Sequence, residues 1–250
     1  MLAALVDLVL PATCALCHVP GGPLCPGCRS AATSSLHPVP RLTMPDPIPP
    51  GMPSCWVAGE ASRALRAVVT AYKDEDRREL RVTLSQWLAP ALRAAASSSP
   101  ELRRALRGRG LLVVPVSGSP RARRRRGDVP LLPLVTDAVR ALPGRVVVAE
   151  VLEPTRVTRD QSSLSATERA TNLGGAMAVR VRHGPVVEGA MCLVVDDLVT
   201  TGATLAEAAR ALRAAGSGHV VAAAIGATRR HAEVASRLPV PSLERVRGGV

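Results

Sequence analysis

Short apolar runs alternate along the chain with longer segments in which apolar residues recur every three or four positions. Four of the apolar runs have the length and β-branched content of buried strands, and they cover 111–116, 146–151, 191–195 and 219–225. A short strand is also expected at 56–58, and a hairpin or extended pair over 176–181 and 185–188. The periodic segments have the spacing of amphipathic helices, and they cover 63–72, 77–95, 131–142 and 205–212. This alternation predicts an α/β fold with a parallel sheet flanked by helices.

The strand predicted at 191–195 leads directly into polar residues. Asp196 and Asp197 come first, and they are followed by a hydroxyl-rich turn composed of Thr200, Thr201, Gly202, Ala203 and Thr204. Thr204 and Glu207 fit a capping box at the start of the next helix. The first turn of that helix should therefore present backbone N–H groups, which favour a bound phosphate through hydrogen bonds and the helix dipole.

The two aspartates complete a predicted ligand site beside this turn. Neighbouring residues of a strand point to opposite sides, so at least one carboxylate of Asp196 and Asp197 should face the phosphate position. A carboxylate there can accept hydrogen bonds from sugar hydroxyls or bind Mg²⁺ through water. The implied ligand combines a phosphate, a diol and a metal ion. An ordinary P-loop is excluded, because the turn lacks the lysine of that motif.

Four cysteines near the N-terminus form two C-x-x-C pairs, Cys14 with Cys17 and Cys25 with Cys28. In a reducing compartment such pairs are usually metal sites, because four thiolates complete the tetrahedral shell of one Zn²⁺. A disulfide pair and a redox-active C-x-x-C are the alternatives. We expect a structural zinc site, since four thiolates leave no open coordination position for catalysis.

Prolines crowd the segment that follows the cysteines. Seven lie between residues 33 and 54, a density that cannot sustain a helix or a central strand. The segment 33–54 is therefore predicted to be an extended linker. It divides the chain into an N-terminal helix and zinc module at 1–32 and a main domain at 55–250. Within that domain, Cys55 and Cys192 stand alone in apolar contexts and are expected to be buried core thiols.

The composition adds a strongly basic balance, with a formal net charge of +12. Such a charge attracts polyanions, including nucleic acid and phosphorylated substrates. The chain has two Trp, one Tyr and no Phe, so contact with single-stranded nucleic acid would be mainly electrostatic. Residues 1–10 are apolar but lack a basic start and a cleavage site, which indicates a short amphipathic helix rather than a secretion signal. We expect a cytoplasmic protein without a membrane span.

Further segments carry candidate phosphate contacts. Lys73 opens a charged turn after the first long helix, where it either contacts a phosphate or faces water. The next buried strand ends in a small-residue loop at Ser117, where backbone N–H groups can approach a pyrophosphate. The arginines at 121–126 can neutralise a pyrophosphate, contact DNA phosphates or face water. The polar loop over 153–166 contains Arg159 and is expected to move.

The stretch V-V-D-D-L-V-T-T-G-A-T closely resembles the phosphoribosyl pyrophosphate (PRPP) binding motif of type I phosphoribosyltransferases. It is accompanied by the four-cysteine module, V-P-V-S before an R-R-x-G segment, R-x-x-R-x-Q-x-x-L, and R-x-x-N-x-x-G-A. Together these features resemble the ComF (ComFC) family over almost the entire chain. That family has a type I phosphoribosyltransferase fold and is associated with uptake of transforming DNA. The chain departs from it at 126–130, where members usually carry R-G-F-N-Q.

The resemblance implies roles for individual residues. Asp196 and Asp197 would hold the ribose hydroxyls and the Mg²⁺ hydration shell, while the turn Thr200–Thr204 would hold the 5′-phosphate. Ser117 would belong to the pyrophosphate loop, and Arg159 to the flexible loop that closes over the reacting centre. The predicted catalytic residues are Asp196, Asp197 and Arg159. The predicted PRPP contacts are Asp196, Asp197, Thr200, Thr201, Gly202, Ala203, Thr204, Ser117 and Lys73.

The implied activity is Mg²⁺-dependent phosphoribosyl transfer with release of pyrophosphate, linked to DNA uptake or single-stranded DNA handling. The candidate partners are PRPP, single-stranded DNA on the basic surface, and a helicase-like competence protein. Two alternatives are a non-catalytic PRPP-sensing adaptor for the DNA-uptake machinery and a plain nucleobase salvage transferase. No residue stands out as a general base, and the sequence does not specify the acceptor.

Overall fold

The computed structural model describes residues 13–116, 130–155 and 175–228. Six strands form its central sheet: β1 (Leu36–Thr43), β2 (Cys55–Glu60), β3 (Leu111–Pro115), β4 (Val146–Val148), β7 (Cys192–Val199) and β8 (Val220–Ala227). Their order across the sheet is β1-β2-β8-β7-β3-β4. All neighbours pair in parallel except β1, which is antiparallel to β2. The predicted α/β fold with a mostly parallel sheet is thus confirmed.

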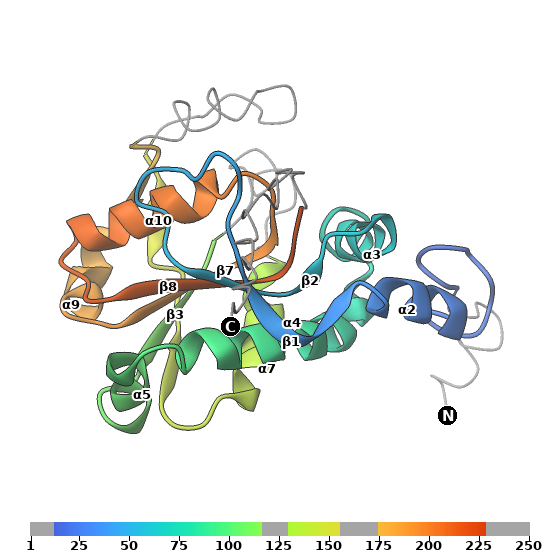
Figure 1. The fold of residues 1–250 in the computed structure, drawn as a ribbon, viewed down its shortest axis with the longest axis horizontal. Coiled ribbons are helices and arrows are strands. Elements are labelled where there is room, and N and C mark those ends of the chain that lie inside the picture. Colours follow the sequence, from blue (N-terminus) through green and yellow to red (C-terminus); the bar gives the residue numbers. More distant parts are fainter. Residues whose placement is uncertain (1–12, 117–129, 156–174, 229–250) are drawn as a thin grey trace, which may run out of the picture.

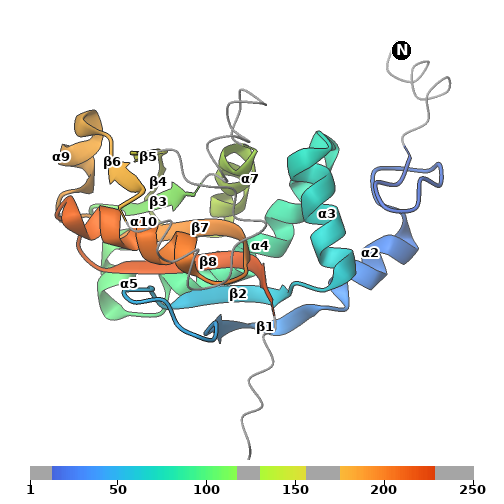
Figure 2. The same cartoon turned by 90° about the horizontal axis from the view of Figure 1, so that it is seen from above.

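Helices cover both faces of this sheet. On one face lies α10 (Ala203–Ala214), with the single-turn α9 (Gly184–Val187) near its end (Figure 1). On the other lie α4 (Arg81–Ala96), α5 (Pro100–Arg107) and α7 (Leu131–Ala138), with the 3₁₀ turns η1 (Arg78–Leu80) and η2 (Val139–Ala141). Beyond the end of the sheet at which the parallel strands terminate, α3 (Arg63–Asp74) lies beside α2 (Pro26–Thr33) (Figure 2). None of the helices in the described ranges combines the length and apolarity that a bilayer crossing requires.

The inner strands β2, β3, β7 and β8 are mostly buried on both faces, which explains their continuous apolar runs. Along β7, Leu193 and Val195 join the core cluster that includes α4, whereas Cys192 and Val194 join the cluster that includes α10. The strand does not end at Val195 as the apolar run predicts, because its ladder with β8 continues to Val199. In contrast, β4 stops at Val148, within the predicted run 146–151.

The proline-rich segment differs from the linker that the sequence predicts. Its first part is β1, which pairs with β2 at the edge of the sheet, where a missing N–H is tolerated. The pairing is irregular between Leu36 and Arg41, the stretch that contains Pro38 and Pro40. Its second part crosses α10, where the carbonyl of Gly51 accepts a 2.7 Å hydrogen bond from Nη1 of Arg213. The prolines favour extended backbone, but long-range contacts fold the segment onto the main domain.

A separate two-stranded ribbon pairs β5 (Leu152–Pro154) with β6 (Met177–Val179) in antiparallel fashion. The sequence predicts an extended segment at 176–181 but pairs it with 185–188. That second prediction is wrong, because η4 (Val181–His183) and α9 occupy this region. Pro185 sits in the first turn of α9, where its missing N–H costs no helical hydrogen bond.

Glu207 fastens this ribbon to α10 instead of forming the predicted capping box. The helix begins at Ala203 with Gly202 as its N-cap residue, so Glu207 lies too far into the helix to cap it. The Glu207 side chain is 4% exposed and accepts a 2.9 Å hydrogen bond from the backbone N–H of Met177. It also forms a 2.7 Å ion pair with Arg210, which donates to the carbonyl of Met177. The carboxylate thereby joins β6 to α10.

We expect Glu207→Gln to lower the free energy of unfolding by about 1–2 kcal/mol at pH 7, because a charge-assisted pair becomes a neutral one. Burial raises the pKa of Glu207, but the hydrogen bonds from Arg210 and Met177 outweigh it, so the folded-state pKa lies below the usual 4.5. The stabilisation is therefore present above pH 4.5 and disappears as the pH falls through the folded-state pKa. Urea titrations at pH 7 and pH 3 measure it.

The matched control is Glu188→Gln, which changes an exposed carboxylate at the end of α9. We expect this control to match the wild type at both pH values. A Glu207→Gln deficit that persists at pH 3 would contradict the assignment, because the protonated carboxyl no longer carries the ion pair.

Candidate functional site

Asp196 and Asp197 lie in the last part of β7, at the edge of the sheet where the parallel strands end. Their side chains extend to opposite sides of the strand, as the alternation predicts. Asp197 reaches the side of α3, where its Oδ2 pairs with Nζ of Lys73. Asp196 lies on the side of Cys55, where burial, and to a smaller extent the charge of Asp196, raise the pKa of the Cys55 thiol. The two carboxylates of this acidic pair therefore lie on opposite sides of β7, one beside Lys73 and the other beside Cys55.

The ion pair between Lys73 and Asp197 joins the last turn of α3 to β7. The Lys73 side chain is 28% exposed and that of Asp197 14%, so water screens the pair only in part. Burial alone lowers the pKa of Lys73, but the charges of Asp197 and Asp196 outweigh burial and raise it. Lys73 is thus a fixed cation beside the acidic pair. No local pattern predicts this ion pair, because Lys73 and Asp197 are 124 positions apart in the chain.

Desolvation raises the pKa of Asp196 to about 7, and the neighbouring charge of Asp197 acts in the same direction. Lys73 opposes this rise. The carboxylates also accept local hydrogen bonds, from the N–H of Asp197 to Oδ1 of Asp196 and from the N–H of Leu198 to Oδ1 of Asp197, both at 2.8 Å. These bonds fix the side chains and leave other lone pairs for hydroxyl groups or a hydrated cation.

The hydroxyl-rich turn lies between β7 and α10, as the sequence predicts. Gly202 adopts the left-handed conformation with φ of +74°, which turns the chain into the helix. Thr201 is buried, and its Oγ1 accepts a hydrogen bond from the N–H of Ala203, whereas Thr200 is exposed and Thr204 partly exposed. The first N–H groups of an α-helix have no partner within the helix, so this turn suits an anion.

We expect Gly202→Ala to destabilise the protein by about 1–2 kcal/mol, because the left-handed region disfavours a Cβ. The new Cβ would also stand 2.5 Å from Sδ of Met52, which must move. Thermal unfolding measures the effect. Gly184→Ala is the matched control, since its φ is not positive and no atom lies within 4 Å of the added Cβ. Equal stability of the two variants would show that the turn is not strained.

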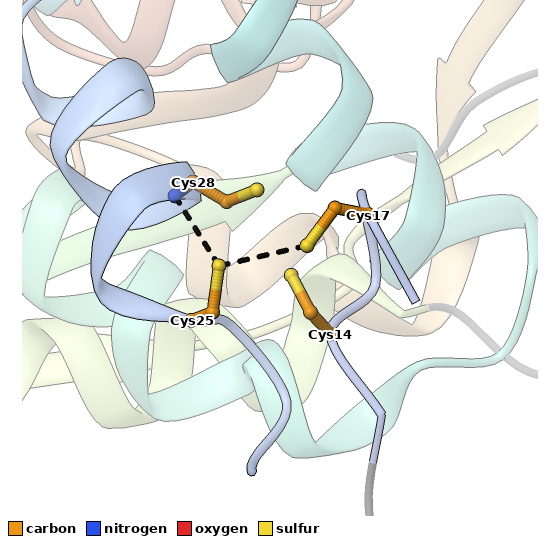
Figure 3. Close-up of side chains that lie close together, drawn as sticks. All are labelled: Cys14, Cys17, Cys25 and Cys28. Atoms are coloured by element: carbon orange, nitrogen blue, oxygen red, sulfur yellow. Dashed lines mark hydrogen bonds between the residues drawn. The ribbon is translucent and has the colours of Figure 1, made fainter. Parts of the chain in front are cut away.

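The four cysteines come together at the N-terminus of the described chain (Figure 3). Their ligand sulfurs lie within 4.8 Å of one another, and the Sγ atoms of Cys17 and Cys25 are 3.6 Å apart. Sulfurs around one tetrahedral Zn²⁺ are separated by about 3.8 Å, given a Zn–S bond of about 2.3 Å. The backbone N–H of Cys28 also donates to Sγ of Cys25 at 3.5 Å. The spacing and the donor set fit zinc, which would close all four coordination positions.

The pKa values of these thiols also favour the binding of a cation. Burial raises the pKa of Cys14, but backbone N–H groups of Cys25, Cys17 and Leu16 outweigh it and lower the pKa to about 6. Hydrogen bonds to Cys25 and Cys17 instead raise the pKa of Cys28 to about 12. Four crowded sulfurs therefore cannot all ionise on their own, and a bound divalent cation would compensate their charge.

Other predicted site residues do not fall within these two groups. Ser117 and Arg159, together with the arginines at 121–126, lie outside the described residues, as does the helix predicted over 1–10. A cavity of about 550 Å³ lies at the opposite end of the parallel strands, where β3 and β7 begin, and Leu111 and Met191 are among the residues that line it. It is therefore separate from the acidic pair.

Comparisons with known proteins address the domain type. Residues 132–243 match the family model described as the phosphoribosyl transferase domain. No curated protein matches the sequence. One solved structure, described as the allosteric regulatory enzyme of purine biosynthesis, aligns at 20% identity and a TM-score of 0.34, over 59% of this chain and 26% of that chain.

A second solved structure is a variant hypoxanthine phosphoribosyltransferase from Trypanosoma cruzi in complex with the product IMP. It aligns at 18% identity and a TM-score of 0.34, over 58% of this chain and 62% of that chain. The family match includes β7, the acidic pair, the hydroxyl-rich turn and α10. This part of the chain is therefore similar to a phosphoribosyl transferase domain.

Proposed function

We propose that the protein binds PRPP with Mg²⁺ and transfers its phosphoribosyl group to an acceptor, with release of pyrophosphate. The observation that carries this proposal is the position of Asp196 and Asp197 at the end of β7, directly before the turn that opens α10. Two carboxylates that could accept hydrogen bonds from a diol thus directly precede a helix N-terminus that could hold a phosphate, the combination that a bound ribose phosphate would require.

Each group in this site has a proposed role. The carboxylates of Asp196 and Asp197 accept hydrogen bonds from the ribose hydroxyls, while the backbone and hydroxyls of Thr200–Thr204 hold the 5′-phosphate. Lys73 is the nearby cation, and it already faces the acidic pair. When PRPP binds, Lys73 can exchange part of its contact with Asp197 for a contact with a phosphate oxygen. Ser117 and Arg159 remain proposed contacts to the pyrophosphate and the reacting centre.

The reaction is displacement of pyrophosphate from C1 of the ribose by a nucleophile of the acceptor. The C1–O bond to pyrophosphate breaks, its electron pair leaves with the pyrophosphate, and the acceptor donates the pair of the new bond. Positive charge develops on the ribose ring, so the site's work is to position the diol and to exclude water. Mg²⁺ bound with PRPP would supply charge neutralisation on the leaving group. Among the described residues of the site, Asp196 is the carboxyl whose pKa is raised, to about 7.

The finer assignment is a ComF-like protein with a role in DNA uptake or single-strand handling. It is supported by the attachment of a four-cysteine group to the PRPP motif and by the net charge of +12. Single-stranded DNA and a helicase-like protein are the proposed partners, in a cytoplasmic setting. A non-catalytic PRPP-sensing adaptor would use the same site without turnover.

Isothermal calorimetry with Mg²⁺ and PRPP tests the proposal directly. We expect one saturable site, and pyrophosphate release in the presence of a suitable acceptor. Binding without release across purine, pyrimidine and amine acceptors would favour the adaptor. Absence of binding to folded, zinc-loaded protein would refute the function proposed for the site.

A further inference from the structure

The C-terminal end of α3 touches three parts of the chain that are distant in sequence. Lys73 pairs with Asp197 of β7. The hydroxyl of Tyr72, one residue earlier, donates a 2.7 Å hydrogen bond to the carbonyl of Pro130, which precedes α7. Just after the helix, Arg77 donates through Nη2 to the carbonyl of Thr13, the residue before Cys14. One helical end therefore contacts both the acidic pair and the residue that precedes the four-cysteine group.

Arg77 is held firmly enough to transmit a displacement. Its backbone N–H donates to the carbonyl of Ala71 at 3.1 Å, which ties it to the last turn of α3. Its Nε forms a 2.5 Å ion pair with Glu79, and its side chain is 21% exposed. The guanidinium is thus fixed on two sides before it reaches Thr13. A shift of the Thr13 carbonyl acts on the turn that carries Lys73.

Packing provides a second connection between the same parts. Cys14 and Leu24 are buried in the hydrophobic cluster that also contains Val68, Val69 and Tyr72 of α3. Helix α2, which begins directly after Cys25, lies against α3 (Figure 2). The cysteine group therefore packs against the domain's core through Cys14, whereas Cys17 is exposed.

The segment that carries the cysteines has few bonds of its own. Between Thr13 and Cys25 it has one isolated bridge, Thr13 with Pro20, and a small number of backbone hydrogen bonds. Such a segment depends on its metal for a fixed conformation, because folding and metal binding share one free energy. Without the metal, the carbonyl of Thr13 has no fixed place at which to receive Arg77.

We propose that metal binding at the four cysteines and PRPP binding at the acidic pair are coupled through the end of α3, with Arg77 as the positioning residue. The PRPP half of this inference rests on the proposed function. The metal-loaded group holds Arg77, Arg77 holds the last turn of α3, and that turn presents Lys73 to Asp197. Linkage makes the effect reciprocal, so PRPP should also strengthen metal binding by the same factor.

Calorimetry with Mg²⁺ and PRPP tests the coupling in the full-length, zinc-loaded protein. We expect Arg77→Ala to retain one Zn²⁺ and to weaken PRPP binding by about tenfold, within the range typical of coupling between sites. Arg77→Lys should restore part of the affinity, since an ammonium group can still donate to Thr13. The matched control is Arg66→Ala, which removes a guanidinium within α3 that donates to the backbone carbonyl of Ala61 at 2.6 Å and to Oγ1 of Thr228 at 2.8 Å.

A second measurement follows the reciprocal effect and does not use turnover. We expect Mg²⁺ and PRPP to slow the transfer of Zn²⁺ to a chromogenic chelator in the wild type, and to do so less in Arg77→Ala. Unchanged PRPP affinity in Arg77→Ala, with zinc transfer indifferent to PRPP, would overturn the coupling. An equal loss of PRPP affinity in Arg66→Ala would also overturn it, because the effect would then be general to α3.

Failure of the proposed function gives a different pattern. If the zinc-loaded wild type does not bind PRPP, hydrogen exchange of the backbone amides over 71–77 decides the structural part of the inference. Loss of protection there on zinc removal, and in zinc-loaded Arg77→Ala, would support transmission from the cysteine group to α3. Protection that is independent of zinc would refute it.

Discussion

Asp197→Asn should weaken the binding of PRPP with Mg²⁺ by at least about 100-fold. Asn has nearly the same shape as Asp, so the change removes a charge and an acceptor and leaves the packing in place. Each hydrogen bond from a ribose hydroxyl to a charged acceptor contributes about 1.5–3 kcal/mol, and two such bonds account for the expected loss. Lys73 also loses its partner and is left as a partly buried cation. Calorimetric titration of both proteins measures the difference.

The substitution has a second expected signature. The charge of Asp197 is one cause of the raised pKa of Asp196, so its removal should lower that pKa from about 7. The control is Asp137→Asn, which neutralises a carboxylate that pairs at 2.9 Å with Arg81, on the helices that cover one face of the sheet. We expect the control to bind PRPP as the wild type does. Equal affinity of Asp197→Asn and the wild type would remove the acidic pair from the proposed site.

Loss of the metal should have the largest effect on stability. We expect Cys14→Ser, or chelation of Zn²⁺ from the wild type, to lower the melting temperature by about 10 °C or more. Structural zinc sites contribute several kcal/mol to folding, and each kcal/mol shifts the melting temperature of a domain this size by about 2–4 °C. Cys14 is fully buried in the main core cluster, so loosening its segment exposes apolar surface. Scanning calorimetry and metal analysis measure the two quantities together.

Cys192→Ala separates metal loss from simple core damage. Cys192 is as buried as Cys14 but lies in β7, outside the four-cysteine group. We expect this control to lose some stability and to keep one Zn²⁺ per chain. If Cys14→Ser also keeps its metal and melts like the wild type, Cys14 is not a ligand of that metal. A wild type that binds no Zn²⁺ would instead show that the cysteines form a different kind of site, such as a disulfide pair.

The features predicted correctly from the sequence are those encoded by neighbouring residues. The strand before Asp196, the turn around Gly202 and the helix after it follow one another within a few residues, so local pattern is sufficient to place them. The cysteine spacing likewise predicts two local turns that each carry two thiols, and a single contact between these turns assembles the four-cysteine group. Alternation along β7 also separates the two carboxylates correctly, because a strand's side-chain period is fixed by its backbone.

Features that depend on distant contacts were not predictable in this way. The pairing of Lys73 with Asp197 and the bond from Arg77 to Thr13 arise only when α3 is placed beside β7 and the cysteine group. Glu207 matched a capping pattern three residues after Thr204, but the left-handed turn at Gly202 starts the helix earlier. The carboxylate was then available to β6, whose position depends on its pairing with β5.

The strands at the two margins of the sheet also determine how the protein behaves at high concentration. At one margin, β1 contains Pro38 and Pro40, so its backbone lacks the N–H donors of two residues and its pairing is irregular there. At the other margin, β4 has only three residues and offers too short a template. Neither margin favours the addition of a strand from a second molecule. Resistance to edge-to-edge aggregation is thus built into the same prolines that the local pattern marks as a break in structure.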